Sequence, residues 1–317
     1  MEIQNLTENH QRCMRFIQHK KEAYWFYRFL SIFYDDYVNP FFWNERMRSE
    51  ALELANLNRR ELKTIDVGSG TGFTTQGIVK KVEPINVHCI DQSPHQMEKA
   101  KQNPELQDCI FNPGDAEDIP YPSDYFDRYI SAGSIEYWPN PLLGIAEAYR
   151  ILKPGGIALV IGPLRPQNRI ARFIADTWML FPEEEEYLDW FKAIGFSEIK
   201  TIFFAPRWVS KEKYGIAVGG IKPSEGASNY KFLNLEKEMR EEKTGFAGAL
   251  LFLIRLLIGT LAGSIFIPIA LLGELWYRIK SFFTKSNLKP DPFRHQQKLS
   301  LSVIFLIVLI TVYWIFF

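Results

Sequence analysis

Residues 63–78, KTIDVGSGTGFTTQGI, have the residue types and spacing that most clearly predict chemistry in this chain. An apolar run ending at Asp66 is followed by three alternating glycines, Gly68, Gly70 and Gly72, and then by a predicted helix. Glycines allow backbone to approach a ligand closely, and the free N–H groups at a helix N-terminus favour a carboxylate or a phosphate. We therefore predict a nucleotide-type site at this turn. The alternative is a tight strand–helix turn that binds no ligand.

Two further residues narrow the kind of ligand. A dinucleotide fingerprint has a third glycine where this chain has Phe73. Asp91 ends the second predicted strand, where a carboxylate can accept hydrogen bonds from both hydroxyls of a ribose. The pattern therefore favours a ribose-containing ligand and disfavours a dinucleotide oxidoreductase.

Alternating strands and helices must position these residues. Short apolar runs predict strands near 63–67, 86–90, 108–111, 126–131, 157–161 and 198–204, and the stretches between them predict helices near 73–81, 94–102, 140–151 and 183–194. Such an alternation forms βαβ units and a mostly parallel sheet. The expected fold class is α/β, a Rossmann-like sheet preceded by a helical region over 14–57 that Pro40 divides.

Composition excludes some classes of protein. Lys+Arg and Asp+Glu both number 37, a balance that argues against a nucleic-acid-binding protein. The 3 cysteines have no metal-type spacing, so we expect neither a metal site nor a disulfide framework. The first residues lack an apolar run behind a basic cluster, which argues against a secretory signal.

The ordered segments between Asp66 and Gly156 resemble the class I S-adenosylmethionine-dependent methyltransferases. These segments are the glycine turn, the strand ending at Asp91, NPGDAEDIPYP, the strand ending at Ser131 and RILKPGG. The resemblance implies that S-adenosylmethionine is the cofactor. The cofactor-binding residues it implies are Asp66, Gly68, Gly70, Gly72, Asp91, Gln92, Asp115, Ala116 and Ser131.

The same resemblance implies a role for most of these residues. The three glycines would wrap the methionine end of the cofactor, and Asp91 would bind the ribose. Asp115 would accept a hydrogen bond from the adenine amino group, and the backbone of Ala116 would meet the adenine ring. Ser131 would line the floor of the site, while Asp66 would orient the turn or meet the amino group of the cofactor.

Three longer stretches are similar to the plastid 2-methyl-6-phytylbenzoquinol/2-methyl-6-solanylbenzoquinol methyltransferases. They are residues 16–40, DQSPHQMEKAKQ and SAGSIEYWPNP. The similarity implies methyl transfer to a ring carbon of a prenylated benzoquinol, a step toward plastoquinone and tocopherols. The alternatives are a methyltransferase of another membrane lipid, such as a ubiquinone- or menaquinone-type ring or a sterol, and a membrane-tethered protein that binds the cofactor without catalysis.

Methylation of a hydroquinone carbon is favoured when a neighbouring phenol loses its proton, so a general base within hydrogen-bond reach would help. Glu136, just past the fourth predicted strand, is the first candidate, and His19 in the N-terminal helical region is the second. A carboxylate that only organises the turn and a solvated histidine are the alternatives. The candidates for substrate contact are Tyr34, Asp35, Tyr137 and Trp138.

The C-terminal region is strongly apolar. Residues 299–317 are long enough to span a bilayer core, at about 28 Å for a helix rising 1.5 Å per residue. Residues 246–273 hold Arg255, Gly263 and Pro268, and we expect them to form a shallow re-entrant element that bends near 263–268. A two-span hairpin is the alternative. The basic stretch between the two segments should stay on the same side as the catalytic domain.

These observations divide the chain into four regions. We predict an N-terminal helical cap over 1–60, a methyltransferase domain over 61–223, a polar linker over 224–245 and a membrane-anchoring region over 246–317. The expected partners are a prenylated quinol and a lipid bilayer, with no nucleic acid and no metal. The catalytic domain would face the stroma at a plastid inner envelope or thylakoid, or the cytoplasm at a prokaryotic cytoplasmic or thylakoid membrane.

Overall fold

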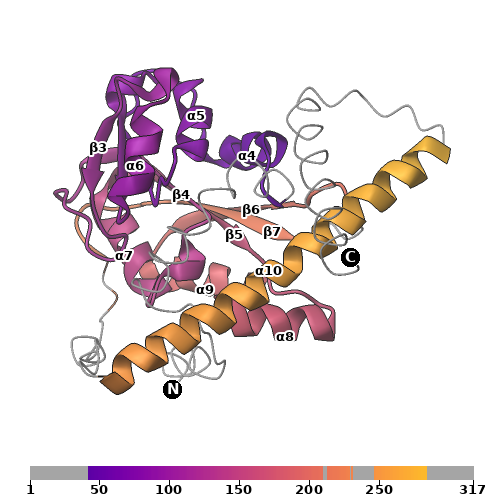
Figure 1. Ribbon diagram of the computed structural model, residues 1–317. Helices are drawn as coiled ribbons and strands as arrows, with labels where there is room; N and C mark the ends of the chain where they lie inside the picture. The colour runs from indigo at the N-terminus through magenta and orange to yellow at the C-terminus, as the bar shows by residue number, and fades with distance from the viewer. Residues whose placement is uncertain (1–41, 210–212, 229, 231–245, 284–317) are drawn as a thin grey trace, which may run out of the picture.

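The computed structural model describes residues 42–209, 213–228, 230 and 246–283. In these residues a central β-sheet is covered by helices on both faces (Figure 1). Three of the residues predicted to act, His19, Tyr34 and Asp35, lie outside the described residues, as does the predicted span over 299–317.

The sheet has seven strands in the order β3-β2-β1-β4-β5-β7-β6. Their bounds are Thr64–Val67 (β1), Val87–Asp91 (β2), Ile110–Pro113 (β3), Phe126–Ala132 (β4), Leu152–Pro163 (β5), Ser197–Phe204 (β6) and Gly215–Ile221 (β7). The first five strands are parallel, and β7 is antiparallel to both of its neighbours. The predicted α/β fold and all the predicted strands are therefore confirmed.

Strand β7 was not predicted, because its sequence GIAVGGI has few of the large side chains that mark a strand. Its glycines make room for the layers on either side. A Cβ added at Gly219 would lie 3.3 Å from Cβ of Leu54, and one added at Gly220 would lie 2.9 Å from the side chains of Phe191 and Phe196. Close packing from both faces thus explains a strand rich in glycine.

The helices form a layer on each side of the sheet (Figure 1). Helices α4 (Glu45–Leu52), α5 (Phe73–Val79) and α6 (Pro94–Lys101) cover one face, and α7 (Pro141–Ile151) and α9 (Glu184–Ile194) cover the other. Each layer has its own buried core, with Ile65 and Val67 in one and Val87 and Cys89 in the other. The sheet therefore alternates its side chains between two apolar cores.

Helix α8 (Arg169–Trp178) was not predicted, although its N-cap is visible in the sequence. The side chain of Asn168 accepts hydrogen bonds from the backbone N–H groups of Ile170 and Ala171, at 3.0 and 3.1 Å. Such a cap satisfies donors that an α-helix leaves free at its start.

Helix α10 (Phe246–Phe283) is one continuous helix that runs across the molecule beside α8 (Figure 1). The expected bend near 263–268 is therefore wrong. Pro268 lies inside the helix, where it removes a single backbone donor. Gly263 allows close packing, since a Cβ there would lie 2.7 Å from Cε2 of Trp178. By length and composition alone, α10 is also the one helix among the described residues that is apolar enough to cross a membrane.

Residues just after β7 fold back onto the domain. Lys222 is fully buried, and its Nζ donates to the carboxylate of Asp124 at 2.6 Å and to the carbonyl oxygen of Gly226 at 2.6 Å. The hydroxyl of Ser228 donates to the carbonyl oxygen of Ile194, also at 2.6 Å. These contacts tie the chain that follows β7 to the sheet and to α9.

Candidate active site

A cavity of about 620 Å³ lies at the carboxyl ends of the parallel strands. This is the edge where open α/β sheets bind their ligands. One part of the cavity is lined by the loops after β1, β2, β3 and β4, and the other part by aromatic and aliphatic side chains from the start of the described chain and from β5 onward. The two parts can hold chemically different groups.

The glycine loop after β1 forms the narrowest wall of the polar part. Gly68, Gly70 and Gly72 all have positive φ, at 72°, 54° and 87°, a conformation that side chains rarely adopt. A Cβ added at Gly68 would lie 2.5 Å from Oγ of Ser134. Gly68 and Gly70 line the cavity, whereas Gly72 packs against Leu106 and is not among the lining residues.

Asp91 joins two of these loops. One of its carboxylate oxygens accepts from the backbone N–H of Gly70 at 2.9 Å, and the other accepts from that of Ser93 at 2.7 Å. Burial raises the pKa of Asp91, and these two hydrogen bonds oppose that change. Asp91 and Gln92 both line the cavity. Each oxygen keeps a lone pair, so the carboxylate can also accept from a ligand hydroxyl.

Asp66 lies beneath the glycine loop and is fully buried. Oδ2 accepts a hydrogen bond from the hydroxyl of Thr75 at 2.7 Å, and Oδ1 has no hydrogen-bond partner in the described part of the chain. Burial raises its pKa to about 7. Asp66 is not among the residues that line the cavity, so its contacts support the prediction that it orients the turn.

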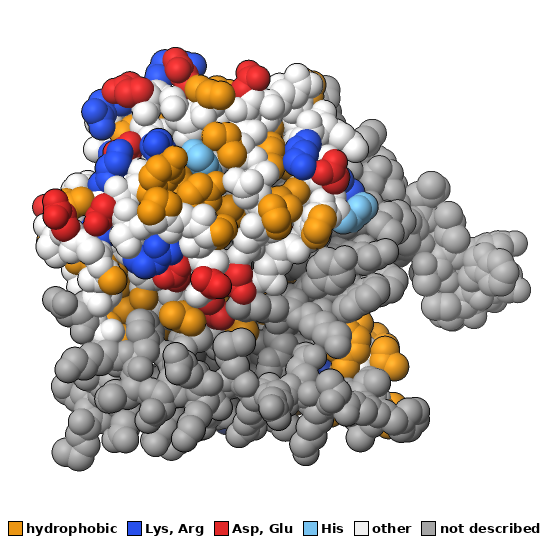
Figure 2. Space-filling model, turned by 90° about the vertical axis from the view of Figure 1, so that its left-hand side faces the viewer, with side chains coloured by type: hydrophobic (Ala, Val, Ile, Leu, Met, Phe, Trp, Pro, Cys, Tyr) orange, Lys and Arg blue, Asp and Glu red, His pale blue; other side chains and the backbone are white. Residues whose placement is uncertain are grey.

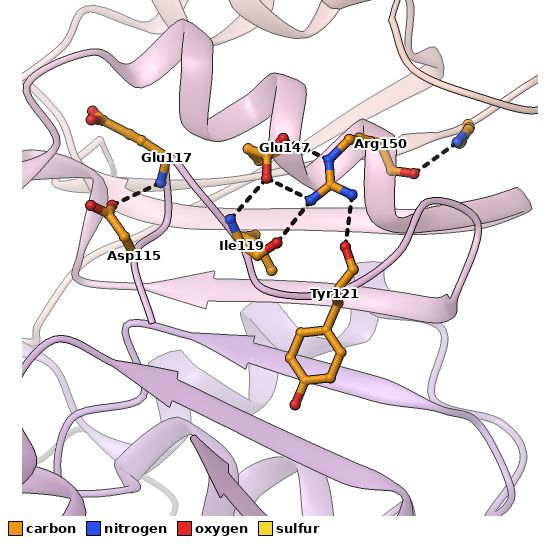
Figure 3. A network of polar contacts seen from close by, with 7 residues as sticks. Asp115, Glu117, Ile119, Tyr121, Glu147 and Arg150 are labelled. Carbon is orange, nitrogen blue, oxygen red and sulfur yellow. Dashed lines mark hydrogen bonds and ion pairs between the residues drawn. The ribbon is translucent and has the colours of Figure 1, made fainter. Parts of the chain in front are cut away.

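The loop after β3 brings Gly114 and Ala116 to the cavity wall. Asp115 is not among the lining residues, and its Oδ1 accepts a hydrogen bond from the backbone N–H of Glu117 at 2.9 Å (Figure 3). The side chain of Glu117 in turn accepts from the backbone N–H of Asn140 at 2.6 Å. Local hydrogen bonds therefore fix the shape of this loop.

A partly buried ion pair on α7 holds the rest of the same loop in place (Figure 3). Arg150 binds Glu147 through two nitrogens, each at 2.7 Å from a carboxylate oxygen. Glu147 accepts from the backbone N–H of Ile119 at 2.8 Å, and Arg150 donates to the carbonyl oxygens of Ile119 and Tyr121 at 2.9 and 2.7 Å. The wall next to Ala116 is therefore rigid, as a site for a flat ring requires.

Ser131 is buried at the end of β4, below the cavity floor. Its hydroxyl lies 3.2 Å from that of Ser134, and the latter accepts a hydrogen bond from Nε1 of Trp138 at 2.8 Å. Ser134 lines the cavity and Ser131 does not. Ser134 was missed in the sequence because nothing in its local pattern shows that it packs against Gly68.

Glu136 lies where the polar and aromatic parts of the cavity meet. It is buried on the short helix η6 (Ile135–Tyr137) and lines the cavity. Its Oε2 has no hydrogen-bond partner among the described residues. Burial raises the pKa of Glu136 to about 8. A buried carboxyl with a free oxygen and a pKa near neutrality is suited to exchanging a proton with a ligand.

The second part of the cavity is aromatic. Trp178 of α8 lies with its ring centroid 5.6 Å from that of Phe266 of α10 and 6.0 Å from that of Phe181. Tyr137 packs against this cluster, and both Tyr137 and Trp138 line the cavity. Further lining side chains come from the start of the described chain, from the end of β6 and from the region after it; they are Phe42, Trp43, Phe204, Trp208 and Tyr214.

The residues of the polar part fit S-adenosylmethionine. Gly68 and Gly70, both with positive φ, leave bare backbone along the cavity, and the carboxylate of Asp91 lies beside them. Across 42–209, 213–228, 230 and 246–283, no group of His, Cys, Asp and Glu side chains is arranged to hold a metal ion. Cys89 and Cys109 are buried free thiols.

Comparison with known proteins agrees with this geometry. Residues 65–160 match the family model described as a methyltransferase domain. The chain is 52% identical over 260 residues to the chloroplastic 2-methyl-6-phytyl-1,4-hydroquinone methyltransferase of Arabidopsis thaliana, covering 80% of this chain and 76% of the relative. It is 49% identical over 273 residues to the enzyme of the same name from Spinacia oleracea, covering 84% and 78%.

A solved structure supports the fold alone. Phosphoethanolamine N-methyltransferase 2 of Haemonchus contortus, solved with S-adenosyl-L-methionine, superposes with a TM-score of 0.51 at 14% identity, covering 63% of this chain and 57% of that one. The fold and the site together define a class I S-adenosylmethionine-dependent methyltransferase. Within that class, the chain belongs to the family of 2-methyl-6-phytyl-1,4-hydroquinone methyltransferases.

Proposed function

We propose that this protein transfers a methyl group from S-adenosylmethionine to a ring carbon of 2-methyl-6-phytyl- or 2-methyl-6-solanyl-benzoquinol, in tocopherol and plastoquinone synthesis. Membership of the hydroquinone methyltransferase family supports the reaction. The structural observation that carries it is the two-part cavity, since a prenylated quinol needs an aromatic and aliphatic wall next to a cofactor site.

The polar part would hold the cofactor, which supplies an electrophilic methyl group when bound. The backbone at Gly68 and Gly70 would contact its methionine end, and Asp91 would accept from its ribose hydroxyls. The rigid loop at Ala116 would contact adenine. Asp66, Gly72, Asp115 and Ser131 would act from behind this wall, because none of them is among the lining residues.

Glu136 would act as the general base. Removing the proton from a quinol hydroxyl raises the electron density at the neighbouring ring carbon, and that carbon forms the new bond to the methyl group. Glu136 lines the cavity, and its Oε2 is buried without a hydrogen-bond partner among the described residues, so this oxygen is available to a quinol hydroxyl that enters the site. Its raised pKa makes it a stronger base than an exposed glutamate, although a smaller fraction is ionised at pH 7.

The cellular setting follows from the relatives and the sequence. Relatives named chloroplastic support a plastid location, with the catalytic domain on the stromal side, where we expect its cofactor. The apolar residues 299–317 and helix α10 support attachment to a lipid bilayer, because the prenylated substrate dissolves there.

The test is a substrate panel. Purified full-length protein in lipid vesicles would receive methyl-labelled S-adenosylmethionine and quinols that carry phytyl, solanyl or no prenyl chain, together with a demethylmenaquinol and a sterol. We expect label in the ring of the phytyl and solanyl substrates, with the methylated carbon identified by NMR of the product. Labelling of the menaquinol or sterol alone would contradict the proposal. Cofactor binding without any turnover would support a non-catalytic role instead.

A further inference from the structure

One face of α10 is packed against the methyltransferase domain. Ala262, Ala270 and Glu274 are buried on this face. Gly263 is in close contact with Trp178, and a Cβ added at Gly273 would lie 2.8 Å from the ring of Trp208. The contact includes the acidic side chain of α10, Glu274, which is turned toward the protein.

The opposite face of α10 is apolar and exposed. Its exposed large side chains are Leu250, Leu251, Leu253, Ile254, Leu257, Leu261, Ile265, Ile269, Leu272, Leu275, Trp276 and Ile279. By contrast, the surface in Figure 2 has acidic and basic side chains interspersed around small apolar groups. A continuous exposed apolar stripe of this length marks a surface for a partner or a membrane.

The packed stretch lies in the middle of α10, which limits how the helix can meet a bilayer. Contacts with the domain run from Leu256 to Glu274. The ends that remain, 246–255 and 275–283, are each about half of the roughly 20 residues needed to cross a hydrocarbon core. Helix α10 therefore cannot span a bilayer while it keeps these contacts.

Helix α8 extends the same apolar surface. It packs along α10, and its Ile170 and Phe173 side chains are each 74% exposed. Basic residues accompany these apolar ones, with Arg169 at the start of α8 and Lys280 in the last turn of α10. An apolar face bordered by basic side chains is typical of helices that lie in the bilayer interface, where the basic groups meet anionic headgroups.

We propose that α8 and α10 lie in the plane of the bilayer surface, and that the prenyl chain of the substrate enters the cavity from the lipid between them. The sequence after α10 favours a lipid bilayer as the occupant of this face. It adds Lys285, Lys289, Arg294 and Lys298 and then the apolar residues 299–317.

The cavity provides the route for the chain. Both helices contribute to its wall, α8 through Ala171 and Trp178 and α10 through Phe266 and Ile269. Ile269 lines the cavity and is also 44% exposed, so it lies where the cavity meets the outer apolar face. A chain passing Ile269 would move from lipid to the aromatic cluster without entering water. This step rests on the proposed function, whereas the in-plane orientation does not.

The orientation is tested by measuring depth along α10. Single cysteines at Leu253, Leu261, Leu272 and Trp276 would carry spin labels in vesicle-bound full-length protein whose native cysteines are replaced by alanine. We expect all four labels at similar shallow depths, within about 10 Å of the headgroups. A spanning helix would instead place Leu261 about 12 Å deeper or shallower than Leu253, and that result would overturn the proposal.

A control and a second outcome complete the depth measurement. A label at Ile85, which is 61% exposed on the short helix η4 (Pro84–Asn86) before β2, should remain in water. If the four labels on α10 contact neither lipid nor water, another part of this chain covers the stripe, and the proposal fails.

The proposed route of the prenyl chain is tested by narrowing the mouth of the cavity. Ile269→Trp would enlarge the side chain at the cavity mouth, and Leu272→Trp would make the same change at a 67% exposed position that does not line the cavity. For Ile269→Trp we expect KM for the phytyl quinol in vesicles to rise on the order of tenfold. For a soluble quinol without a prenyl chain, KM should change less than about twofold.

The possible failures give different results. Equal effects of Ile269→Trp on both substrates, or equal effects of the two variants, would overturn the proposed route. No change in either substrate would also overturn it. If the unmodified protein methylates none of the quinols, the proposed function fails, and the depth measurement still decides the orientation of α10.

Discussion

The two parts of the cavity are built in different ways. The polar part consists of loops that follow consecutive parallel strands, with Asp91 joined to Gly70 and Ser93 by backbone hydrogen bonds. The aromatic part is assembled from segments far apart in the chain, such as Trp178 of α8 and Phe266 of α10. The comparison shows that one part of the cavity is formed by neighbouring loops of the sheet, whereas the other depends on the packing of α10 against α8.

The largest effect is expected at the junction of the two parts. Glu136→Gln removes the proposed base but retains its size, so kcat should fall by roughly 10²–10⁴-fold with little change in the affinity for cofactor. In the unmodified protein, kcat should rise with pH through about 8, because the carboxyl must lose its proton to act. Steady-state rates between pH 6 and 9 measure both effects. Cofactor affinity that falls as far as kcat would contradict the assignment.

Although Glu136→Gln should lower kcat, the same substitution should increase the stability of the folded protein at pH 8. Because folding raises the pKa of Glu136, the folded state favours the protonated form, and stability is lost as pH rises from the ordinary glutamate range through about 8. Glu136→Gln should therefore be more stable than the unmodified protein at pH 8, and the difference should disappear near pH 4. Thermal unfolding at the two pH values tests this.

The next largest effect is expected in the polar part of the cavity, as a loss of cofactor affinity. Gly68→Ala places a Cβ against Ser134 in the cavity wall, so affinity for S-adenosylmethionine should fall on the order of 100-fold. Gly155→Ala is a matched control, because Gly155 has a similar φ of 75° but no atom within 4 Å of the added Cβ. Calorimetric titration should show a loss of affinity in the first variant alone. A similar loss of affinity in both variants would mean that backbone strain, and not the shape of the glycine loop, determines cofactor binding.

A smaller loss of cofactor affinity is expected at Asp91. In Asp91→Asn, an amide nitrogen replaces a carboxylate oxygen that accepted a hydrogen bond from a backbone N–H, so two donors face each other. The substitution also removes one acceptor for the ribose. The dissociation constant should rise about 10- to 100-fold. Asp108→Asn, a change at an exposed acid, is the control. Unchanged binding in Asp91→Asn would contradict the placement of the ribose.

The smallest effect is expected in the aromatic part. Phe266→Leu removes one ring of the cluster with Trp178 and Phe181 while keeping the side chain apolar. KM for the phytyl quinol should rise about fivefold, and cofactor affinity should remain unchanged. Measuring KM for the phytyl quinol and the dissociation constant of the cofactor in the same variant tests whether the two parts of the cavity act separately. If cofactor affinity falls and the KM for quinol does not, the two parts of the cavity are not separable.

How much was predictable from the sequence also differs between the two parts. The glycine turn follows β1, Asp91 ends β2 and Glu136 lies in the loop after β4, so their places along the chain were sufficient to bring them to one edge of the sheet. Tyr137 and Trp138 follow Glu136 and reach the cavity for the same reason. The mostly parallel pairing followed from the alternation of strands and helices, whereas the order of the strands is known only from the structure.

The features that were missed depend on contacts between distant segments. Strand β7 is hidden in a glycine-rich sequence, since its glycines are set by packing against Leu54 and Phe196. Glycine and proline in the apolar segment suggested a bend, but Gly263 is there to admit Trp178 of α8. No local pattern shows that partner, so the aromatic part of the cavity and the straight course of α10 became visible only in the folded structure.

The central claim is that the prenyl chain lies between α8 and α10 while the cofactor lies against the glycine loop. It is tested most directly with a phytyl quinol that carries a photoreactive group near the end of its chain, bound to the full-length protein in vesicles with S-adenosylhomocysteine present. After illumination, mass spectrometry of the peptides should place the cross-links at Trp178, Phe266 or Ile269. Cross-links confined to the glycine loop after β1, or to the Ile85 face, would contradict the account.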